Sequence, residues 1–381
     1  MSVLVVGASA AGLSTVEALR RKGYQEPITV VGAEWHLPYD RPPLSKQFLC
    51  VDWDEDRTRL RPDTMLSALE AEFVLGDSAV GLDIDRRTVH TASGRERQAD
   101  AVVIATGLRA RVLPGQDGLD GVHVLRTLDD AASLRKDLLE ASRVVVVGDG
   151  VLGAEIAATA RKMGLSVTMA GPQAAPLQSQ FGPVVAGLLA ELHASEGVQL
   201  KLGTAVTGLT DEGGRVTGVR LETGEVLPAD VVVVALGAVP ATEWLADSGL
   251  RLDNGVVCDA RCRAAEGIYA AGDVARWQHE DSLLRLENRT NATEQAACVA
   301  ANIIGDAQSY RPVPYFWTDQ FATKIQVHGV PSQAAEVTVA EGNIDERRFV
   351  VHYRRDGRDV AVLGWNMPKQ TRLHREHLVY A

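Results

Sequence analysis

Two glycine-rich segments of the chain have the spacing of loops that hold phosphate groups. The first reads GASAAG from Gly7 to Gly12 and joins an apolar run at 2–7 to a helical pattern. Gly7 permits a tight turn, Gly12 permits close packing of helix on strand, and the N–H groups at the helix N-terminus can bind a pyrophosphate. Glu34 follows the next apolar run, at the distance expected of a ribose acceptor. The segment predicts a dinucleotide site, although Ser9 stands where another glycine is usual.

The second segment reads GDGVLG and keeps all three glycines, Gly148, Gly150 and Gly153. The strand after it ends at Gly171, so the acidic ribose acceptor is missing there. Between residues 171 and 200 the chain has two glutamates and no lysine or arginine. A 2′-phosphate without a cationic partner is costly to desolvate, so we expect NADH rather than NADPH. A domain of this kind without any ligand is the alternative.

The elements around these loops repeat along the chain. Apolar runs and amphipathic helices alternate at 2–32 and again at 143–171, which indicates parallel sheets covered on both faces. Apolar strands at 99–107 and 229–237 each follow an alternating stretch typical of a small antiparallel meander. After residue 310 the chain alternates like short antiparallel strands.

The pattern predicts an α/β fold with two Rossmann-like dinucleotide-binding domains and a C-terminal α+β domain. We expect the first domain at 1–108 and 236–309, interrupted by the second domain at 109–235. The C-terminal domain is expected at 310–381.

Composition excludes several classes of protein. A net charge of −11 argues against nucleic-acid binding, and no apolar run reaches the roughly 20 residues that span a bilayer. The N-terminus lacks the basic region of a signal peptide, so we expect a cytoplasmic protein. Its four cysteines form no CxxC or CxxxxC redox pair and are expected as reduced thiols. No metal site is expected, and His36 and His328 are interpreted as surface or packing residues rather than proton shuttles.

Residues 38–46 read PYDRPPLSK, and further motifs follow along almost the whole chain. They are ATGLRAR at 105–111, LRTLDDA at 125–131, GDGVLGAEIA at 148–157, IYAAGDVA at 268–275, RLENRTNATEQ at 285–295 and YFWTDQF at 315–321. In this order and spacing they resemble the FAD-dependent, NADH-linked ferredoxin reductases that serve cytochromes P450 and Rieske dioxygenases. The resemblance implies the fold of glutathione reductase without its redox disulfide, since PPLSK occupies the place of the cysteines.

The resemblance also implies which residues bind the cofactors. FAD would bind the first domain and NAD(P)H the second. The residues expected at FAD are Gly7, Ala10, Ala11, Gly12, Glu34, Arg41, Lys46, Val80, Ala105, Thr106, Gly107, Arg126, Gly272, Asp273, Arg289 and Trp317. Those expected at NAD are Gly148, Gly150, Val151, Leu152, Gly153, Glu155 and Gly237. Asp273 would accept hydrogen bonds from the ribityl chain, with a plain helix N-cap as the alternative.

Lys46 and Glu155 are the candidate catalytic residues. The resemblance implies that both lie beside flavin N5, where a hydride arrives, and that the lysine holds the glutamate and stabilises charge on the reduced flavin. A purely structural ion pair is the alternative. Two departures from the family stand out: Arg289 replaces a frequent tryptophan at the flavin edge, and the chain ends at Ala381, earlier than many relatives, so its partner surface is expected to differ.

We therefore expect an FAD-dependent NAD(P)H:ferredoxin oxidoreductase. A hydride would pass from NADH to flavin N5, and single electrons would leave to a [2Fe–2S] or [3Fe–4S] ferredoxin that serves a cytochrome P450 or Rieske oxygenase. Residues 341–381 carry eight basic and six acidic residues, which would steer an acidic partner or form an ordinary solvated face. Two further readings stay open: a partner-independent NADH-dependent flavin oxidase or reductase, and a redox-sensing binding protein similar to apoptosis-inducing factor. A monomer is slightly preferred.

Overall fold

The computed structural model describes residues 1–331 and 335–379. Its contacts divide the chain into two compact units. The first unit comprises residues 1–40, 58–109 and 239–312, and the second comprises residues 41–57, 110–238 and 313–381. The segment Arg41–Arg57, which carries Lys46, therefore belongs with the second glycine loop rather than with the first.

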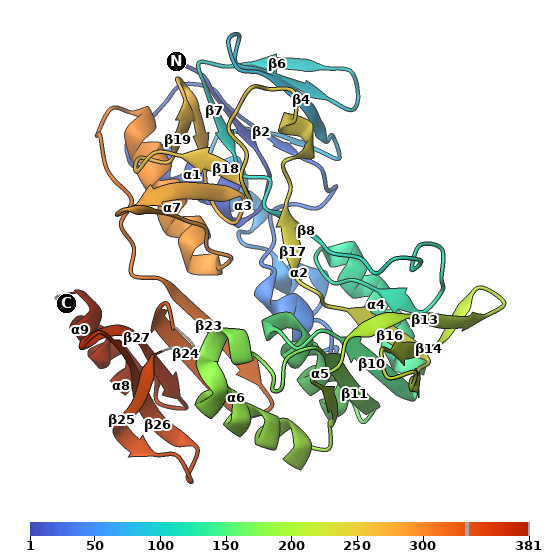
Figure 1. Cartoon of the computed structure of the whole chain (residues 1–381). Coiled ribbons are helices and arrows are strands. Elements are labelled where there is room, and N and C mark those ends of the chain that lie inside the picture. Colours follow the sequence, from blue (N-terminus) through green and yellow to red (C-terminus); the bar gives the residue numbers. More distant parts are fainter. Residues whose placement is uncertain (332–334, 380–381) are drawn as a thin grey trace. The chain divides into compact units, whose positions relative to one another are not determined.

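The first unit is built on a six-stranded sheet with α1 (Ala10–Arg21) and α7 (Arg289–Ile303) packed against each other beside it (Figure 1). All pairings between neighbouring strands of this sheet are parallel, except the antiparallel pairing of β19 (Arg263–Ala265) with β20 (Ile268–Ala270). Central strand β1 is buried along its whole length, as expected of a sheet covered on both faces. In sheet order the strands are β19 (Arg263–Ala265), β20 (Ile268–Ala270), β7 (Ala101–Ile104), β1 (Val3–Val6), β2 (Ile28–Gly32) and β3 (Glu72–Leu75).

Two three-stranded sheets and two short helices complete this unit. The elements are β4 (Ala79–Asp83), β5 (Thr88–Thr91), β6 (Glu96–Gln98), β18 (Val256–Cys258), β21 (Ala275–His279), β22 (Ser282–Leu284), α3 (Asp63–Ser67) and η2 (Glu243–Leu245). The β4–β5–β6 meander is the antiparallel insertion expected before the apolar strand at 99–107.

The second unit contains a parallel five-stranded sheet of the same kind. In sheet order its strands are β12 (Gln199–Leu202), β11 (Ser166–Gly171), β10 (Arg143–Val147), β16 (Val231–Val234) and β9 (Val122–His123). Its helices are α4 (Leu128–Glu140), α5 (Val151–Lys162) and α6 (Gln178–Ser195), with short η1 (Pro42–Ser45) and α2 (Glu55–Thr58). A second meander consists of β13 (Val206–Glu212), β14 (Arg215–Leu221) and β15 (Val226–Pro228). Short strands β8 (Leu108–Ala110) and β17 (Ala238–Pro240) pair where the chain passes between the units.

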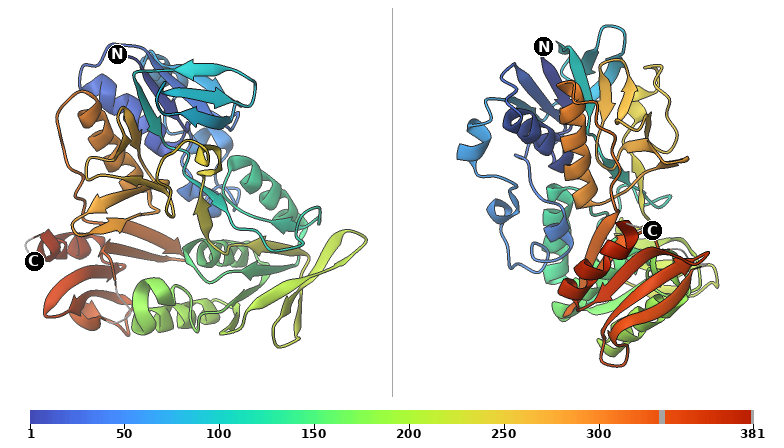
Figure 2. Two further views of the ribbon diagram at one scale, coloured as in Figure 1. Left: turned by 45° about the horizontal axis from the view of Figure 1, so that its top comes forward. Right: turned by 90° about the vertical axis from the view of Figure 1, so that its left-hand side faces the viewer.

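The C-terminal part of the second unit is an antiparallel sheet with helix α8 (Pro368–His374) packed on β24 and β27 (Figure 2). In sheet order the strands are β23 (Tyr315–Gln320), β24 (Thr323–Gly329), β27 (Arg358–Trp365), β26 (Arg348–Arg355) and β25 (Glu336–Asn343), and α9 (Glu376–Val379) follows α8. Phe349, Tyr353 and Trp365 are fully buried in it. The Tyr353 hydroxyl donates to the carbonyl of Phe181 at 2.8 Å, which connects this antiparallel sheet to helix α6.

The fold class predicted from the sequence is confirmed. The two strand–loop–helix–strand repeats, both meanders and the antiparallel C-terminal sheet are all present. All four cysteines are free thiols. No helix within 1–331 and 335–379 is long and apolar enough to cross a membrane.

Buried His328 makes the C-terminal sheet sensitive to acid. Its ring stacks on Tyr315 with 4.7 Å between centroids, and burial, helped by the charge of Arg375, lowers its pKa to about 4. An unfolded histidine titrates near 6.5, so the unfolded state binds the proton first as the pH falls. The stability that depends on neutral His328 is therefore complete above about pH 6.5 and is lost as the pH falls towards 4, up to about 3 kcal/mol.

We predict that His328→Gln flattens this loss of stability. Urea unfolding at pH 7 and pH 4.5 should show a smaller difference for the variant than for the wild type. His90→Gln, at a histidine whose side chain is 44% exposed, is the control and should behave like the wild type. Equal pH dependence in the wild type and His328→Gln would contradict the prediction.

Candidate functional site

The first glycine loop has the geometry that the sequence predicts. Gly7 has φ of +121°, and a Cβ added there would lie 2.1 Å from the carbonyl oxygen of Ala105. A Cβ at Gly12 would lie 1.8 Å from the carbonyl oxygen of Gly7, so neither position can hold a side chain. The loop enters α1 at Ala10, whose first turn presents N–H groups to a ligand.

The turn after β20 lies against this loop. A Cβ at Gly272, which has φ of +79°, would lie 3.0 Å from the Cβ of Ala11. The N–H of Gly272 donates to Oε1 of buried Gln295 on α7 at 2.8 Å, which fixes the turn that precedes Asp273. The structure thus brings the predicted Ala11, Gly272 and Asp273 to one place in the first unit. Gln295 was not predicted, although it lies inside the RLENRTNATEQ motif.

Other predicted residues of the first unit follow its strands. Glu34 comes two residues after β2, and its carboxylate accepts a hydrogen bond from the hydroxyl of Tyr39. Ala105, Thr106 and Gly107 follow β7, and the Thr106 hydroxyl donates to the carbonyl of Ala241 at 2.8 Å. Val80 on β4 is 55% exposed, and the predicted contact with a ligand is through its backbone.

Arg289 begins α7 and forms an ion pair. Its Nε lies 2.7 Å from Oδ1 of Asp40, and its guanidinium also donates to the hydroxyl of Thr293. The sequence predicted a cation at this position, and the structure adds that Asp40 balances it. Asp40 lies in the PYDRPPLSK motif, but nothing in the sequence alone indicated a pairing across 249 residues.

The second glycine loop repeats the geometry of the first. A Cβ at Gly148, with φ of +129°, would lie 2.2 Å from the carbonyl oxygen of Ala235, and one at Gly153 would lie 2.2 Å from the carbonyl oxygen of Gly148. Gly150, the N-cap of α5, has open space around it. Val151 and Leu152 form the first turn of the helix, and Gly237 follows β16 with φ of +86°.

Lys46 and Glu155 form a buried ion pair inside the second unit. Nζ of Lys46 lies 2.6 Å from Oε2 of Glu155, and the two side chains are 12% and 7% exposed. The helix α5 places Glu155 two residues after Gly153, and the single turn η1 places Lys46 directly after Ser45. Nζ also donates to the carbonyl of Pro42 at 3.0 Å, which holds the ammonium in this position. The structure therefore brings the two predicted catalytic residues together.

Two hydroxyl groups complete the shell around Glu155. Ser45 Oγ donates to Oε2 at 2.7 Å, and Thr318 Oγ1 donates to Oε1 at 2.8 Å. The hydroxyl of Thr159 donates to the carbonyl of Ser45 at 2.7 Å and keeps η1 against α5. A buried carboxylate is tolerated only when donors replace its lost water, and both of its oxygens have donors here.

The network continues from Thr318 into the core. Gln320 Nε2 donates to Oγ1 of Thr318 at 3.1 Å, and Oε1 of Gln320 lies 2.7 Å from Nε2 of His193 on α6. Burial lowers the pKa of His193, so its ring is neutral at neutral pH and donates to Gln320. Sequence reasoning missed Ser45, Thr318, Gln320 and His193. Successive strand residues face opposite sides, so the alternation of YFWTDQF could have shown that Thr318 and Gln320 share a face.

The remaining predicted residues of the second unit lie near these elements. Trp317 is on the opposite face of β23, stacked on Tyr315 with 6.0 Å between ring centroids. Arg41 Nε donates to the carbonyl of Arg126 at 3.1 Å. A capping box between Thr127 and Asp130 begins α4 and fixes the backbone at Arg126, whose N–H donates to Asp130.

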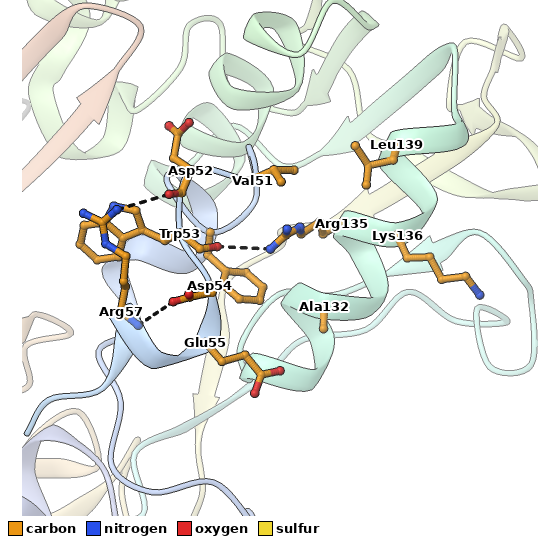
Figure 3. A pocket seen from close by; sticks show the side chains of 11 residues that line it. Val51, Asp52, Trp53, Asp54, Glu55, Arg57, Ala132, Arg135, Lys136 and Leu139 are labelled. Atoms are coloured by element: carbon orange, nitrogen blue, oxygen red, sulfur yellow. Dashed lines mark hydrogen bonds between the residues drawn. The ribbon is translucent and has the colours of Figure 1, made fainter. Parts of the chain in front are cut away.

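An open pocket in this unit lies between the segment that follows η1 and helix α4 (Figure 3). Two of its charged groups have partners in the pocket wall: Arg135 donates to the carbonyl of Trp53, and Arg57 donates to that of Asp52. Arg57 also lies over the Trp53 ring at 4.9 Å. The pocket contains none of the predicted site residues, so we do not assign the site to it.

Two Rossmann-type glycine loops, each at the start of a helix on a parallel sheet, define a dinucleotide-dependent oxidoreductase. Residues 1–296 match the family model described as pyridine nucleotide-disulphide oxidoreductase, and residues 315–379 match the one described as reductase C-terminal. The chain belongs to the pyridine nucleotide-disulphide oxidoreductase family.

Its relatives agree over nearly their whole length. The chain is 36% identical to the rhodocoxin reductase of Rhodococcus erythropolis, over 97% of this chain and 87% of that protein. It is 36% identical to the ferredoxin–NAD(+) reductase subunit of a Pseudomonas putida benzene 1,2-dioxygenase system, over 96% of this chain and 90% of that protein. The solved covalent complex of putidaredoxin reductase with putidaredoxin matches with a TM-score of 0.95 and 32% identity, covering 99% of this chain and 92% of that one. The resemblance inferred from the motifs is confirmed.

We predict that Thr318→Val destabilises the folded protein. The change keeps the shape of the side chain but removes the donor to Oε1 of buried Glu155, so we expect a loss of about 1–3 kcal/mol in the free energy of unfolding. Chemical denaturation measures it. Thr207→Val, at an exposed threonine of β13, is the control, and a Thr318→Val variant as stable as that control would show that the hydrogen bond is dispensable.

Proposed function

We propose that this protein is an FAD-dependent NAD(P)H:ferredoxin reductase that oxidises NADH and delivers single electrons to a small iron–sulfur ferredoxin. The observation that carries the proposal is the buried Lys46–Glu155 pair next to the second glycine loop, in a family whose description names disulphide chemistry. In this chain PPLSK stands where a redox cysteine pair would be expected, and all four cysteines lie elsewhere as free thiols.

The residues of the first unit suit FAD. Gly7 and Gly12 leave a cradle that a Cβ would fill, and the α1 N-terminus beside it favours a pyrophosphate. Gly7, Ala10, Ala11, Gly12, Glu34, Val80, Ala105, Thr106, Gly107, Gly272, Asp273 and Arg289 would hold it. In the second unit Arg41, Lys46, Arg126 and Trp317 would contribute on the flavin side. Bound FAD supplies the conversion of a hydride into two single electrons.

The second unit would bind the nicotinamide dinucleotide. Open space at Gly150 lets the backbone approach the pyrophosphate, and Gly148, Val151, Leu152, Gly153, Glu155 and Gly237 surround the same loop. The ammonium of Lys46 would stabilise negative charge on the reduced flavin. The carboxylate of Glu155, which has hydrogen-bond donors on both of its oxygens, would hold the ammonium in position.

The partner would be a [2Fe–2S] or [3Fe–4S] ferredoxin that serves a cytochrome P450 or Rieske oxygenase. Support comes from the relatives that are named for such systems and from the solved complex with putidaredoxin. Exposed basic residues of the C-terminal part, among them Arg355, Arg358, Arg372 and Arg375, would attract an acidic partner. We propose the cytoplasm as its location, which suits four free thiols.

The central test is an anaerobic titration. The purified yellow protein should be bleached by NADH, and reduction of cytochrome c should then depend on an added [2Fe–2S] ferredoxin. A correctly folded protein that takes up no flavin would overturn the proposal. Equal cytochrome c reduction with and without ferredoxin would instead identify a partner-independent reductase.

We predict that Lys46→Met slows the reduction of flavin by NADH more than it lowers the occupancy of FAD. The change removes the ammonium and leaves Glu155 as a buried charge with two hydroxyl donors, so we expect a loss of at least about tenfold in rate. Stopped-flow absorbance measures the rate, and the flavin-to-protein absorbance ratio measures occupancy. Lys162→Met changes an exposed lysine of α5, the helix that carries Glu155, and the flavin of this variant should be reduced at the wild-type rate. Reduction of the flavin-loaded Lys46→Met protein at that rate would contradict the prediction.

A further inference from the structure

The two glycine loops can be compared residue by residue because their strands have the same register. The N–H of Gly7 donates to the carbonyl of Val31, and the N–H of Gly148 donates to that of Ala170. Gly171 therefore corresponds to Gly32, and counting two residues further places Gln173 at the position of Glu34. Asp149 corresponds in the same way to Ala8. The second loop thus has an amide where the first has its acid, and an acid where the first has alanine.

The carboxylate of Asp149 fills the space over Gly171. A Cβ built on Gly171 would lie 2.3 Å from Oδ2 of Asp149 and 2.7 Å from its Cγ. At the end of this strand a dinucleotide-binding fold usually carries the acid that binds the ribose. Gly171 cannot carry a side chain while Asp149 is in this position. The position of the first loop's acid is held by Gln173, so in the second loop the carboxylate comes from Asp149 instead.

Gln173 fixes the direction of this carboxylate. Its backbone N–H donates to Oδ2 of Asp149 at 2.8 Å, and its side-chain amide donates to Oδ1. Oε1 of Gln173 in turn accepts from the N–H of Ser179 at 2.6 Å, which sets the orientation of the amide. An ionised carboxylate has about four acceptor positions, so the two bonds from Gln173 leave capacity for hydroxyl groups of a ligand.

We propose that Asp149 is the ribose-binding carboxylate of the second loop and selects a dinucleotide with a free 2′-hydroxyl, that is, NADH over NADPH. The proposal rests on the proposed binding of a nicotinamide dinucleotide to this loop. A 2′-hydroxyl donates to the carboxylate, whereas a 2′-phosphate meets a fixed negative charge. The stretch from 171 to 200 contains no lysine or arginine to offset it, and the next cation, Lys201, pairs with Glu225 at 2.7 Å.

Calorimetric binding to the flavin-loaded protein tests the proposal without turnover. The probes are ADP-ribose and 2′-phospho-ADP-ribose. The wild type should bind ADP-ribose more tightly than 2′-phospho-ADP-ribose. Asp149→Asn should weaken the binding of ADP-ribose by about tenfold and reduce the difference in affinity between the two probes. Glu196→Gln, which removes an exposed carboxylate at the end of α6, should leave both affinities unchanged.

A relocation of the acid separates ribose binding from a structural role. The double variant Asp149→Ala/Gln173→Glu gives the second loop the residues that the first loop has at these positions, Ala8 and Glu34, and should restore the preference for ADP-ribose that Asp149→Asn loses. Wild-type protein that binds neither probe would overturn the proposed dinucleotide site itself. Binding of ADP-ribose by Asp149→Asn with wild-type affinity and selectivity would overturn only the role of Asp149.

Discussion

The buried carboxylate of Glu155 is the constraint on which the candidate site depends. A carboxylate that is 7% exposed needs donors to replace its water, and no segment near it in sequence supplies them all. Ser45 is the last residue of η1, Lys46 follows it, and Thr318 comes from β23, so three distant parts of the chain must meet to give the Glu155 carboxylate its hydrogen-bond donors. The ion pair is therefore a consequence of the tertiary fold and also a reason for its specificity.

Strand β23 connects the surroundings of Glu155 to the C-terminal sheet. On one face of β23, Phe316 stacks on Phe181, Thr318 donates to Glu155 and Gln320 contacts His193. The other face carries Tyr315 and Trp317. The C-terminal sheet thus contributes side chains to the hydrogen-bond network around Glu155. A change in β23 that moves this strand would alter the electrostatics at Lys46 without touching it.

The local elements could be predicted from the sequence because each has a local cause. Continuous valine runs gave parallel strands, and the glycines of both loops stand where a Cβ would meet backbone. Lys46 and Glu155 were reached only through resemblance, since nothing in 109 residues of separation indicates their contact. Thr318, Gln320 and His193 were missed for the same reason. Asp149 lies in the predicted GDGVLG loop, but its contact with the end of β11 at Gly171 could not be predicted from the sequence.

The buried ion pairs and the exposed charges act over different distances. The charge of Lys46 is paired with that of Glu155 at contact distance. Arg289 is paired with Asp40 in the same way. The two charges largely cancel at long range, so Arg289 cannot by itself attract an acidic protein. Long-range attraction of an acidic partner must then come from exposed basic residues such as Arg355, Arg358 and Arg372, on a chain whose net charge is −11. Residues 341–381 carry eight basic and six acidic residues, so this segment repels an acidic partner less than the chain as a whole does.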